Sequence, residues 1–110
     1  MRILVTGGAG YIGSVCVEDL LNRGHNVTVF DNLTEGHKTA IDRRAKFVQG
    51  DLADEPAVLD LVRTERPEAV MHFAANALVG ESMQNPYKYF YNNVCCGLNL
   101  LHAIDRKSVV

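Results

Sequence analysis

Three glycines near the start of the chain have the spacing of a phosphate-binding turn. Gly7, Gly10 and Gly13 follow the apolar run 3–5 and open a stretch of helical periodicity. In such a series one glycine permits a tight strand-to-helix turn, one lets the backbone approach a pyrophosphate, and one lets the helix pack closely on the strand. The free N–H groups and the positive dipole end of the helix would attract phosphate. The spacing therefore predicts that the phosphates of a dinucleotide bind here.

A carboxylate follows at the distance at which a ribose would be held. Asp31 ends the apolar, β-branched run 27–30, about 20 residues beyond the glycine series. A carboxylate at that place accepts hydrogen bonds from ribose hydroxyls and repels a 2′-phosphate, and Asn32 and Leu33 add no positive charge. We therefore expect NAD in preference to NADP. The alternative is an ordinary polar residue that ends a strand.

The hydrophobic pattern predicts strands that alternate with helices. Strands are expected at 2–6, 27–30, 46–49 and 69–74, helices at 11–23, 54–65 and 86–106, a polar loop with room for a short helix at 32–42, and the start of a fifth strand at 108–110. This alternation predicts an α/β fold, a Rossmann-like parallel sheet with helices on both faces, incomplete at its fifth strand. Right-handed crossovers give the strand order 3-2-1-4 and place a ligand crevice between the first and fourth strands.

Apolar rows and end signals refine the expected helices. The core-facing residues of the first and last helices are expected to be Ile12, Cys16, Leu20, Val17 and Leu21, and Phe90, Val94, Leu98 and Leu101. A glycine at position 24 should stop the first helix, and Asp54 should cap the second.

Size and composition exclude several classes of function. The 110 residues suffice for one domain, 1–110, and a net charge of −2 with a pI near 6.0 argues against a nucleic-acid surface. No apolar run approaches the roughly 20 residues that span a membrane, and a strand at the N-terminus leaves no room for a signal peptide. The odd cysteine count indicates reduced thiols and a cytoplasmic protein, and the cysteines and histidines lack zinc-ligand spacing, so no metal is expected.

Six segments together resemble one group of enzymes. They are TGGAGYIGS at 6–14, DNL at 31–33, GDL at 50–52, HFAA at 72–75, VGES at 79–82 and YFYNNV at 89–94. This set is similar to that of the extended short-chain dehydrogenase/reductases, and most of all to the UDP-glucose 4-epimerases among the NAD-dependent epimerases and dehydratases. The resemblance implies inversion of a UDP-hexose at C4 through a 4-keto intermediate, with NAD reduced and reoxidised in each cycle.

The resemblance also implies the residues that bind the cofactor. They are Gly7, Gly10, Tyr11, Ile12 and Gly13 at the pyrophosphate; Asp31, Asn32, Thr34, Glu35 and Gly36 at the adenosine; Asp51 and Leu52 at the adenine; and Phe73, Ala74 and Ala75 under the nicotinamide side. Asn92 matches a further cofactor contact of the family. A local turn or cap role for Asp51 and a solvent-exposed helix position for Asn92 remain open as alternatives.

The chain departs from the family pattern in two positions and one motif. Ala77 stands where many epimerases have lysine, and Cys96 stands where glycine is usual. The family's catalytic Tyr-x-x-x-Lys pair is missing, because no tyrosine here has a lysine four positions later. The resemblance therefore implies an NAD-binding N-terminal portion without catalytic residues or the sugar-binding C-terminal region. Such a chain is expected to be inactive alone and to meet a nucleotide sugar only within a full-length enzyme.

Two other functions and an assembly state remain open. The chain could be the cofactor half of another nucleotide-sugar dehydratase, decarboxylase or reductase, or a stand-alone nucleotide-binding module. We expect a homo-oligomer, formed as a dimer through the last helix or through the exposed edge of the fourth strand.

Overall fold

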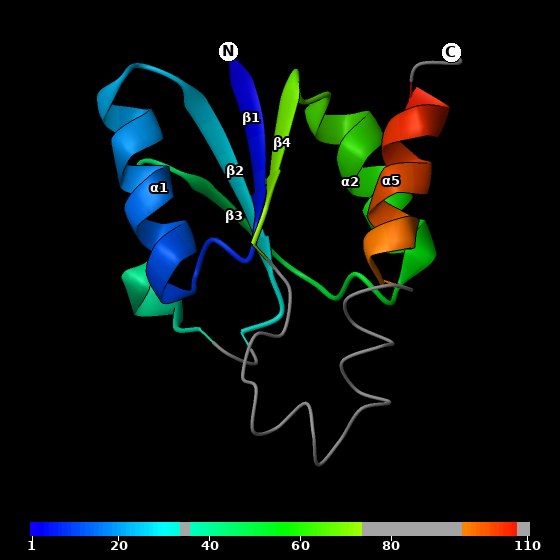
Figure 1. Ribbon diagram of the computed structural model, residues 1–110, viewed down its shortest axis with the longest axis horizontal. Coiled ribbons are helices and arrows are strands. Elements are labelled where there is room, and N and C mark those ends of the chain that lie inside the picture. The colour runs from blue at the N-terminus through cyan, green and yellow to red at the C-terminus, as the bar shows by residue number, and fades with distance from the viewer. Residues whose placement is uncertain (34–35, 74–95, 108–110) are drawn as a thin grey trace. The chain divides into compact units, whose positions relative to one another are not determined.

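The computed structural model describes residues 1–33, 36–73 and 96–107, in which strands and helices alternate (Figure 1). In chain order the elements are β1 (Arg2–Thr6), α1 (Tyr11–Asn22), β2 (Asn26–Asp31), the 3₁₀ turn η1 (Lys38–Ala40), β3 (Lys46–Gln49), α2 (Glu55–Glu65), β4 (Ala69–His72) and α5 (Cys96–Lys107). Two compact units make up the chain: Met1–Asp51 with Glu65–Ala74, and Leu52–Thr64 with Ala75–Val110.

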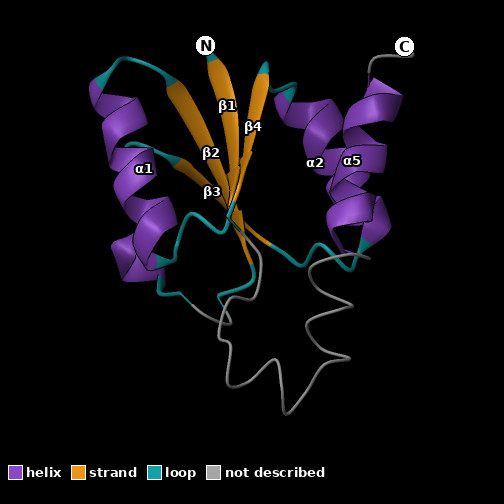
Figure 2. Ribbon diagram, in the orientation of Figure 1, coloured by secondary structure: helices purple, strands orange, loops and turns teal. Residues whose placement is uncertain are grey.

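The four strands form one parallel sheet in the order β3-β2-β1-β4, which confirms the predicted Rossmann-like α/β fold (Figure 2). β1 lies between β2 and β4, so that Ile3 is paired with Val27 on one side and with Ala69 on the other. β4 ends at His72, two residues before its predicted end, and the expected fifth strand at 108–110 lies outside the described residues.

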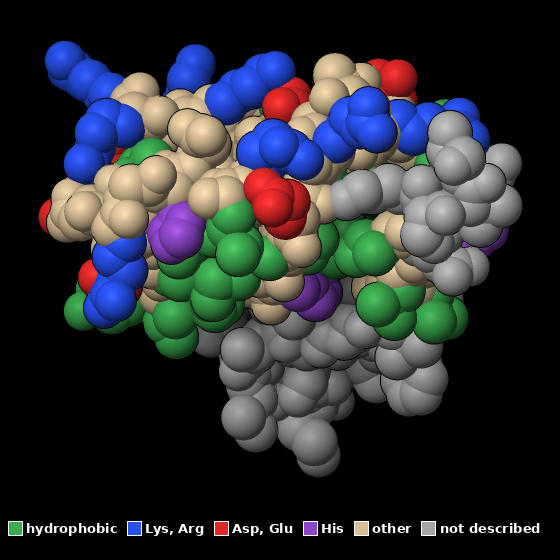
Figure 3. Space-filling view, turned by 90° about the horizontal axis from the view of Figure 1, so that it is seen from above, with side chains coloured by type: hydrophobic (Ala, Val, Ile, Leu, Met, Phe, Trp, Pro, Cys, Tyr) green, Lys and Arg blue, Asp and Glu red, His purple; other side chains and the backbone are tan. Residues whose placement is uncertain are grey.

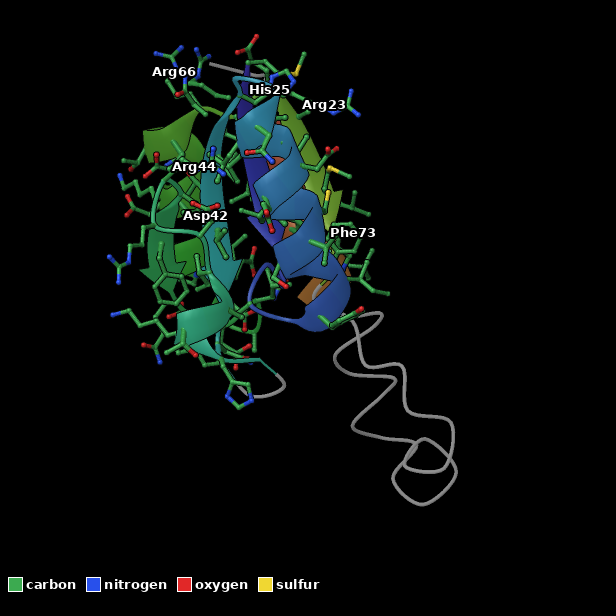
Figure 4. The ribbon with its side chains drawn as sticks, turned by 90° about the vertical axis from the view of Figure 1, so that its left-hand side faces the viewer. Arg23, His25, Asp42, Arg44, Arg66 and Phe73 are labelled. Atoms are coloured by element: carbon green, nitrogen blue, oxygen red, sulfur yellow. The ribbon has the colours of Figure 1, made fainter. Side chains whose placement is uncertain are left out.

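The core of the first unit lies between the sheet and α1. Ile3, Val5, Val27 and Val29 are buried on one face of the sheet together with Val17 of α1. The parallel register brings these four strand residues to the same face, because alternate side chains of a strand point the same way. Figure 4 shows α1 lying along this face. The packing of α1 on the sheet thus fixes the position of the turn that connects β1 to α1.

The buried row of α1 differs from the predicted row at its first member. Ile12 was expected in the core but is 67% exposed, whereas Gly13 and Val17 are buried. Cys16 and Leu20, the other members of the row predicted with Ile12, are only half-buried. The prediction for Ile12 was wrong because the row that faces the sheet passes through a glycine. Successive helix residues turn by about 100°, so the side chain beside that glycine points away.

In the second unit, α2 and α5 lie side by side (Figure 2). The Asn99 side-chain nitrogen donates to the Leu52 carbonyl oxygen at 2.9 Å, and His102 Nδ1 lies 3.1 Å from Glu55 Oε1. α2 buries Val58, Leu61 and Val62.

The buried face of α5 also differs from the predicted stripe. α5 buries Leu100 and Ala103, whereas Leu98 and Leu101, which were expected in the core, are 57% and 61% exposed. Two rows of this helix have apolar residues at helical spacing, and periodicity alone cannot choose between them. The rest of the predicted stripe, at 90 and 94, lies outside the described residues.

The predicted helix end signals are confirmed. Asp54 Oδ1 accepts from the Ala57 N–H at 3.2 Å, and the Asp54 carbonyl accepts from the Val58 N–H, as an N-cap residue should. At the end of α1, Gly24 has a φ of +87° and donates its N–H to the Leu21 carbonyl.

Replacing Gly24 tests the left-handed conformation without a steric conflict, because no atom of the described residues lies within 4 Å of a Cβ at this position. Gly24→Ala should lower the free energy of unfolding by about 1–2 kcal/mol, the cost of the left-handed region for a residue with a Cβ. Gly24→Asn should cost less, because asparagine tolerates this region better. Urea unfolding measures both values, and wild-type stability in Gly24→Ala would contradict the assignment.

Candidate functional site

The turn between β1 and α1 forms a glycine loop, residues 7–10, at the edge of the sheet where the parallel strands end. Gly7 has a φ of +75° and donates its N–H to the Phe30 carbonyl of β2 at 3.0 Å. Gly10 donates to the Gly7 carbonyl at 3.1 Å, and the Gly10 carbonyl accepts from the Ser14 N–H at 2.9 Å. Ligands of parallel α/β sheets bind at this edge.

Gly13 permits the close contact between α1 and the glycine loop. A Cβ at position 13 would lie 2.3 Å from the Gly7 carbonyl oxygen and 3.0 Å from the Gly8 Cα. These neighbours are backbone atoms, which cannot move aside as a flexible side chain can. Glycine at this position therefore serves the packing of the helix on the strand end.

At position 10, in contrast, no described neighbour excludes a side chain. Gly10 lies at the N-cap of α1 with φ −77° and ψ 174°, an extended conformation open to any residue. Among the residues that the structure describes, an added Cβ would approach only the Gly7 carbonyl oxygen, at an ordinary 3.5 Å. No described residue thus fills the space beside Gly10 at the N-terminus of α1, where free N–H groups attract anions. A ligand that approaches the backbone would explain the glycine.

Asp31 joins the end of β2 to the glycine loop. Its carboxylate is buried, with 9% of the residue exposed. Oδ2 accepts from the Ala9 N–H at 3.0 Å, and Oδ1 accepts from the Leu33 N–H at 2.7 Å. The Asp31 carbonyl accepts from the Gly50 N–H at 3.2 Å. Sequence reasoning assigned this carboxylate to a ribose and gave Ala9 no role, because a partner that acts through its backbone leaves no signal in residue type.

The segment after β2 also reaches the glycine loop. The His37 N–H donates to the Ala9 carbonyl at 3.2 Å, and a Cβ at Gly36 would lie 2.5 Å from the same oxygen. Asn32 is exposed in this segment, and Thr34 and Glu35 lie outside the described residues. The described residues that were predicted to bind the adenosine thus lie next to those predicted to bind the pyrophosphate.

Other predicted residues are placed as follows. Asp51 follows β3 and is exposed, whereas Leu52 is buried in the second unit. Phe73 follows β4, donates its N–H to the Thr6 carbonyl at 2.8 Å and packs beside the core face that α1 covers (Figure 4). Tyr11 is 87% exposed at the start of α1. Ala74, Ala75 and Asn92 lie outside the described residues.

Thr6 and His72 are the last residues of β1 and β4. These two strands are neighbours at the switch point of the sheet, where the chain passes from one side of β1 to the other. The two residues are partners in the register, and the fully buried Thr6 hydroxyl is hydrogen-bonded to His72 Nδ1. Partial burial lowers the pKa of His72, which favours the neutral imidazole. His72 is thus the last residue of β4, and its ring has a hydrogen-bond partner within the fold. This pair holds the two strand ends together at the border of the expected crevice.

A hollow lies at the opposite edge of the sheet, where the strands begin. Its volume is about 320 Å³, and its lining includes Arg2, Arg44 and Lys46. Figure 3 looks onto this side of the molecule, where blue Lys and Arg side chains gather. Each of the three cations is already paired with a carboxylate: they contact Glu68, Asp42 and Glu65, respectively. Arg44 also holds the pKa of its partner Asp42 at about 2. This pairing leaves little attraction for an anion.

The described residues lack both a metal-binding cluster and a membrane-spanning helix. They contain no group of three or more histidine, cysteine or acidic side chains that could hold a metal ion. None of the described helices has the length and apolar character needed to cross a membrane.

Comparison with known proteins places this architecture in a family. The sequence profile of the NAD dependent epimerase/dehydratase family matches residues 3–110. The chain belongs to this family. It is 49% identical over 109 residues to the UDP-glucose 4-epimerase of Lactobacillus helveticus, an alignment that covers 99% of this chain and 33% of that protein.

Solved structures of epimerases have the same fold as this family member. The Thermus thermophilus UDP-glucose 4-epimerase in complex with NAD matches with a TM-score of 0.95 and 46% identity, over 99% of this chain and 35% of that one. The Brucella ovis UDP-glucose 4-epimerase in complex with NAD matches with a TM-score of 0.93 and 42% identity, over 97% and 33%. The chain thus spans about a third of the length of these relatives.

Replacing Gly10 or Gly13 by alanine should change the free energy of unfolding by different amounts. Gly13→Ala should lower the free energy of unfolding by about 3 kcal/mol, because the methyl group collides with backbone that cannot move aside. Gly10→Ala should stay within about 1 kcal/mol of the wild type, because its conformation and space accept alanine. Urea unfolding of both variants measures the difference, and equal losses would contradict the assigned roles.

Proposed function

We propose that this family member is the NAD-binding part of a UDP-glucose 4-epimerase. The observation that carries the proposal is the space beside Gly10 that no described residue fills, at the N-terminus of a helix that Gly13 packs against the end of β1. None of the described neighbours requires glycine at position 10, whereas a pyrophosphate lying against the backbone would. The NAD complexes of the relatives from Thermus thermophilus and Brucella ovis support the same cofactor here.

The residues of the chain bind and orient the cofactor in this proposal. The backbone around Gly10, Tyr11, Ile12 and Gly13 would hold the pyrophosphate, with Gly7 shaping the turn. The adenosine would be held by Asp31, Asn32, Thr34, Glu35, Gly36, Asp51 and Leu52, and the nicotinamide side by Phe73, Ala74 and Ala75. Asn92 would make a further contact with the cofactor. When bound, NAD supplies a hydride acceptor and donor. The chain's contribution is to fix the cofactor's position and to disfavour a 2′-phosphate through the carboxylate of Asp31.

The parent reaction that we propose is inversion of a UDP-hexose at C4, carried out by a longer cytoplasmic enzyme. The relatives are named UDP-glucose 4-epimerases and are about three times as long as this chain. No tyrosine in the chain has a lysine four positions later, so a general base of the family type is not supplied by these 110 residues. We therefore propose that the 110-residue chain binds the cofactor without turning over UDP-galactose.

Cofactor titration tests this proposal. By isothermal calorimetry the chain should bind NAD about tenfold or more tightly than NADP, because the Asp31 carboxylate repels the 2′-phosphate. Gly10→Ala should weaken NAD binding at least about tenfold, because its methyl group enters the space of the pyrophosphate. Gly24→Ala, at the other end of α1, is the matched control and should keep the wild-type affinity. Tighter binding of NADP, or unchanged NAD binding by Gly10→Ala, would refute the assignment.

We also propose that the chain forms a dimer through α5. Leu98 and Leu101 are one turn apart on this helix and are largely exposed, which supports an apolar contact with a second copy. The other possible contact is the outer edge of β4, which among the described strands pairs with β1 alone.

Light scattering at high protein concentration tests the dimer. The wild type should have twice the mass of one chain, and the double variant Leu98→Lys/Leu101→Lys should be a monomer. Val15→Lys, which replaces an equally exposed apolar residue on α1, should remain a dimer. A monomeric wild type would contradict the proposal, and a dimer that survives the double variant would point to the edge of β4.

A further inference from the structure

The backbone at Ala9, in the middle of the glycine loop, is held from two directions. Its N–H donates to Asp31 Oδ2 at 3.0 Å, and its carbonyl accepts from the His37 N–H at 3.2 Å. Ala9 is 2% exposed, so neither group can turn to water instead. Both partners belong to β2 and the segment after it, residues 31–37. The conformation of the glycine loop thus depends on that segment.

The carboxylate of Asp31 uses both of its oxygens on the backbone. Oδ2 accepts from Ala9, and Oδ1 accepts from Leu33, whose φ of +64° turns the chain sharply after β2. Hydrogen bonds to an ionised carboxylate are shorter and stronger than those between neutral groups. One side chain therefore fixes the glycine loop and the turn after β2 at the same time.

Gly36 strengthens this connection by having no side chain. A Cβ at this position would lie 2.5 Å from the Ala9 carbonyl oxygen and 2.9 Å from the Gly10 nitrogen. These are backbone atoms of the glycine loop, so any larger residue would push the loop and the 31–37 segment apart. The predicted adenosine and pyrophosphate regions therefore share one backbone junction.

We propose that Asp31 is a positioning residue for the phosphate-binding loop, separately from any contact it makes with a ribose. The carboxylate holds the Ala9 N–H, so affinity for the phosphates depends on Asp31 even when a ligand has no ribose hydroxyls. This inference rests on the proposed function in one respect, that the glycine loop receives the phosphates. A substitution at Asp31 made to admit NADP would also loosen the phosphate-binding loop.

The pair ADP and 2′,3′-dideoxy-ADP separates the two roles of Asp31. Asp31→Asn keeps the shape of the side chain but turns one acceptor oxygen into an NH₂ donor, which cannot face the N–H of Ala9 or of Leu33. Positioning predicts that Asp31→Asn weakens binding of both nucleotides, dideoxy-ADP by about tenfold. A ribose contact alone predicts that dideoxy-ADP binds the variant and the wild type equally, and that result would overturn the inference.

Asp42→Asn is the matched control for this titration. Asp42 Oδ1 accepts from the N–H two residues later, in Arg44, at 2.9 Å, as Asp31 Oδ1 does from Leu33. Asp42 lies outside the glycine loop, so its variant should bind both nucleotides like the wild type. Gly36→Ala should weaken dideoxy-ADP binding as Asp31→Asn does, because it disturbs the same junction from the other side. Wild-type dideoxy-ADP affinity in Gly36→Ala would count against the inference.

Amide hydrogen exchange, followed by NMR without ligand, tests the junction directly. In Asp31→Asn the Ala9 amide should exchange at least about tenfold faster, while the Gly7 amide, bonded to the Phe30 carbonyl, keeps its protection. A merely destabilised fold would accelerate both amides equally, and continued protection of Ala9 would overturn the inference. If the wild type binds neither nucleotide, the proposed function fails, yet this exchange experiment still decides the role of Asp31.

Discussion

The close approach of α1 to the carboxyl end of β1 is the contact on which the rest of the site depends. Gly13 lies against the Gly7 carbonyl with no space for a Cβ, and this contact sets the angle at which the helix leaves the turn. Gly8 likewise lies against Val29, where a Cβ would be 2.7 Å from a methyl carbon. Because the helix is fixed in this way, the N–H groups of its first turn face the edge at which all four strands end. Glycine here is needed for packing density as much as for backbone freedom.

Polar groups at this edge are satisfied by one another, which lets them be buried. Thr6 and Asp31 are the polar residues buried among those that the structure describes, and each has a partner on a neighbouring segment. No buried side-chain nitrogen or oxygen in the described residues lacks a hydrogen bond. A buried polar group without a partner costs about 1–3 kcal/mol. These bonds therefore hold β1, β2 and β4 in a defined arrangement around the site.

The sequence predicted those features in which residue type determines backbone geometry. It failed to predict which face of a helix is buried, because that depends on the neighbouring elements. Strand alternation gave the order 3-2-1-4, and the glycine at position 24 marked the end of α1. Ile12 was misplaced because the buried row of α1 runs through a glycine, which a hydrophobic pattern does not register. Leu98 and Leu101 were misplaced because both faces of α5 have apolar residues at helical spacing.

For the candidate site, the sequence indicated the region and the cofactor class but not the connections. The glycine spacing and Asp31 pointed to the edge of the sheet at which the glycine loop meets the end of β2. The hydrogen bond from the Ala9 N–H to Asp31 could not be predicted from the sequence, because any residue except proline supplies a backbone N–H. The close contact of Gly36 with the glycine loop was equally hidden, since it joins segments that are distant in the sequence.

The central position of β1 has a consequence for how the chain folds. Ile3 pairs with Val27, which follows after one helix, and with Ala69, which follows only after β3 and α2. Closing the longer loop costs about 1 kcal/mol more conformational entropy than closing the shorter one. Pairing of β1 with β2 and packing of α1 are therefore favoured early, and capture of β4 comes late. The glycine loop would thus take its shape while the other side of the crevice is still open. φ-value analysis would reveal this order as higher values in β2 than in β4.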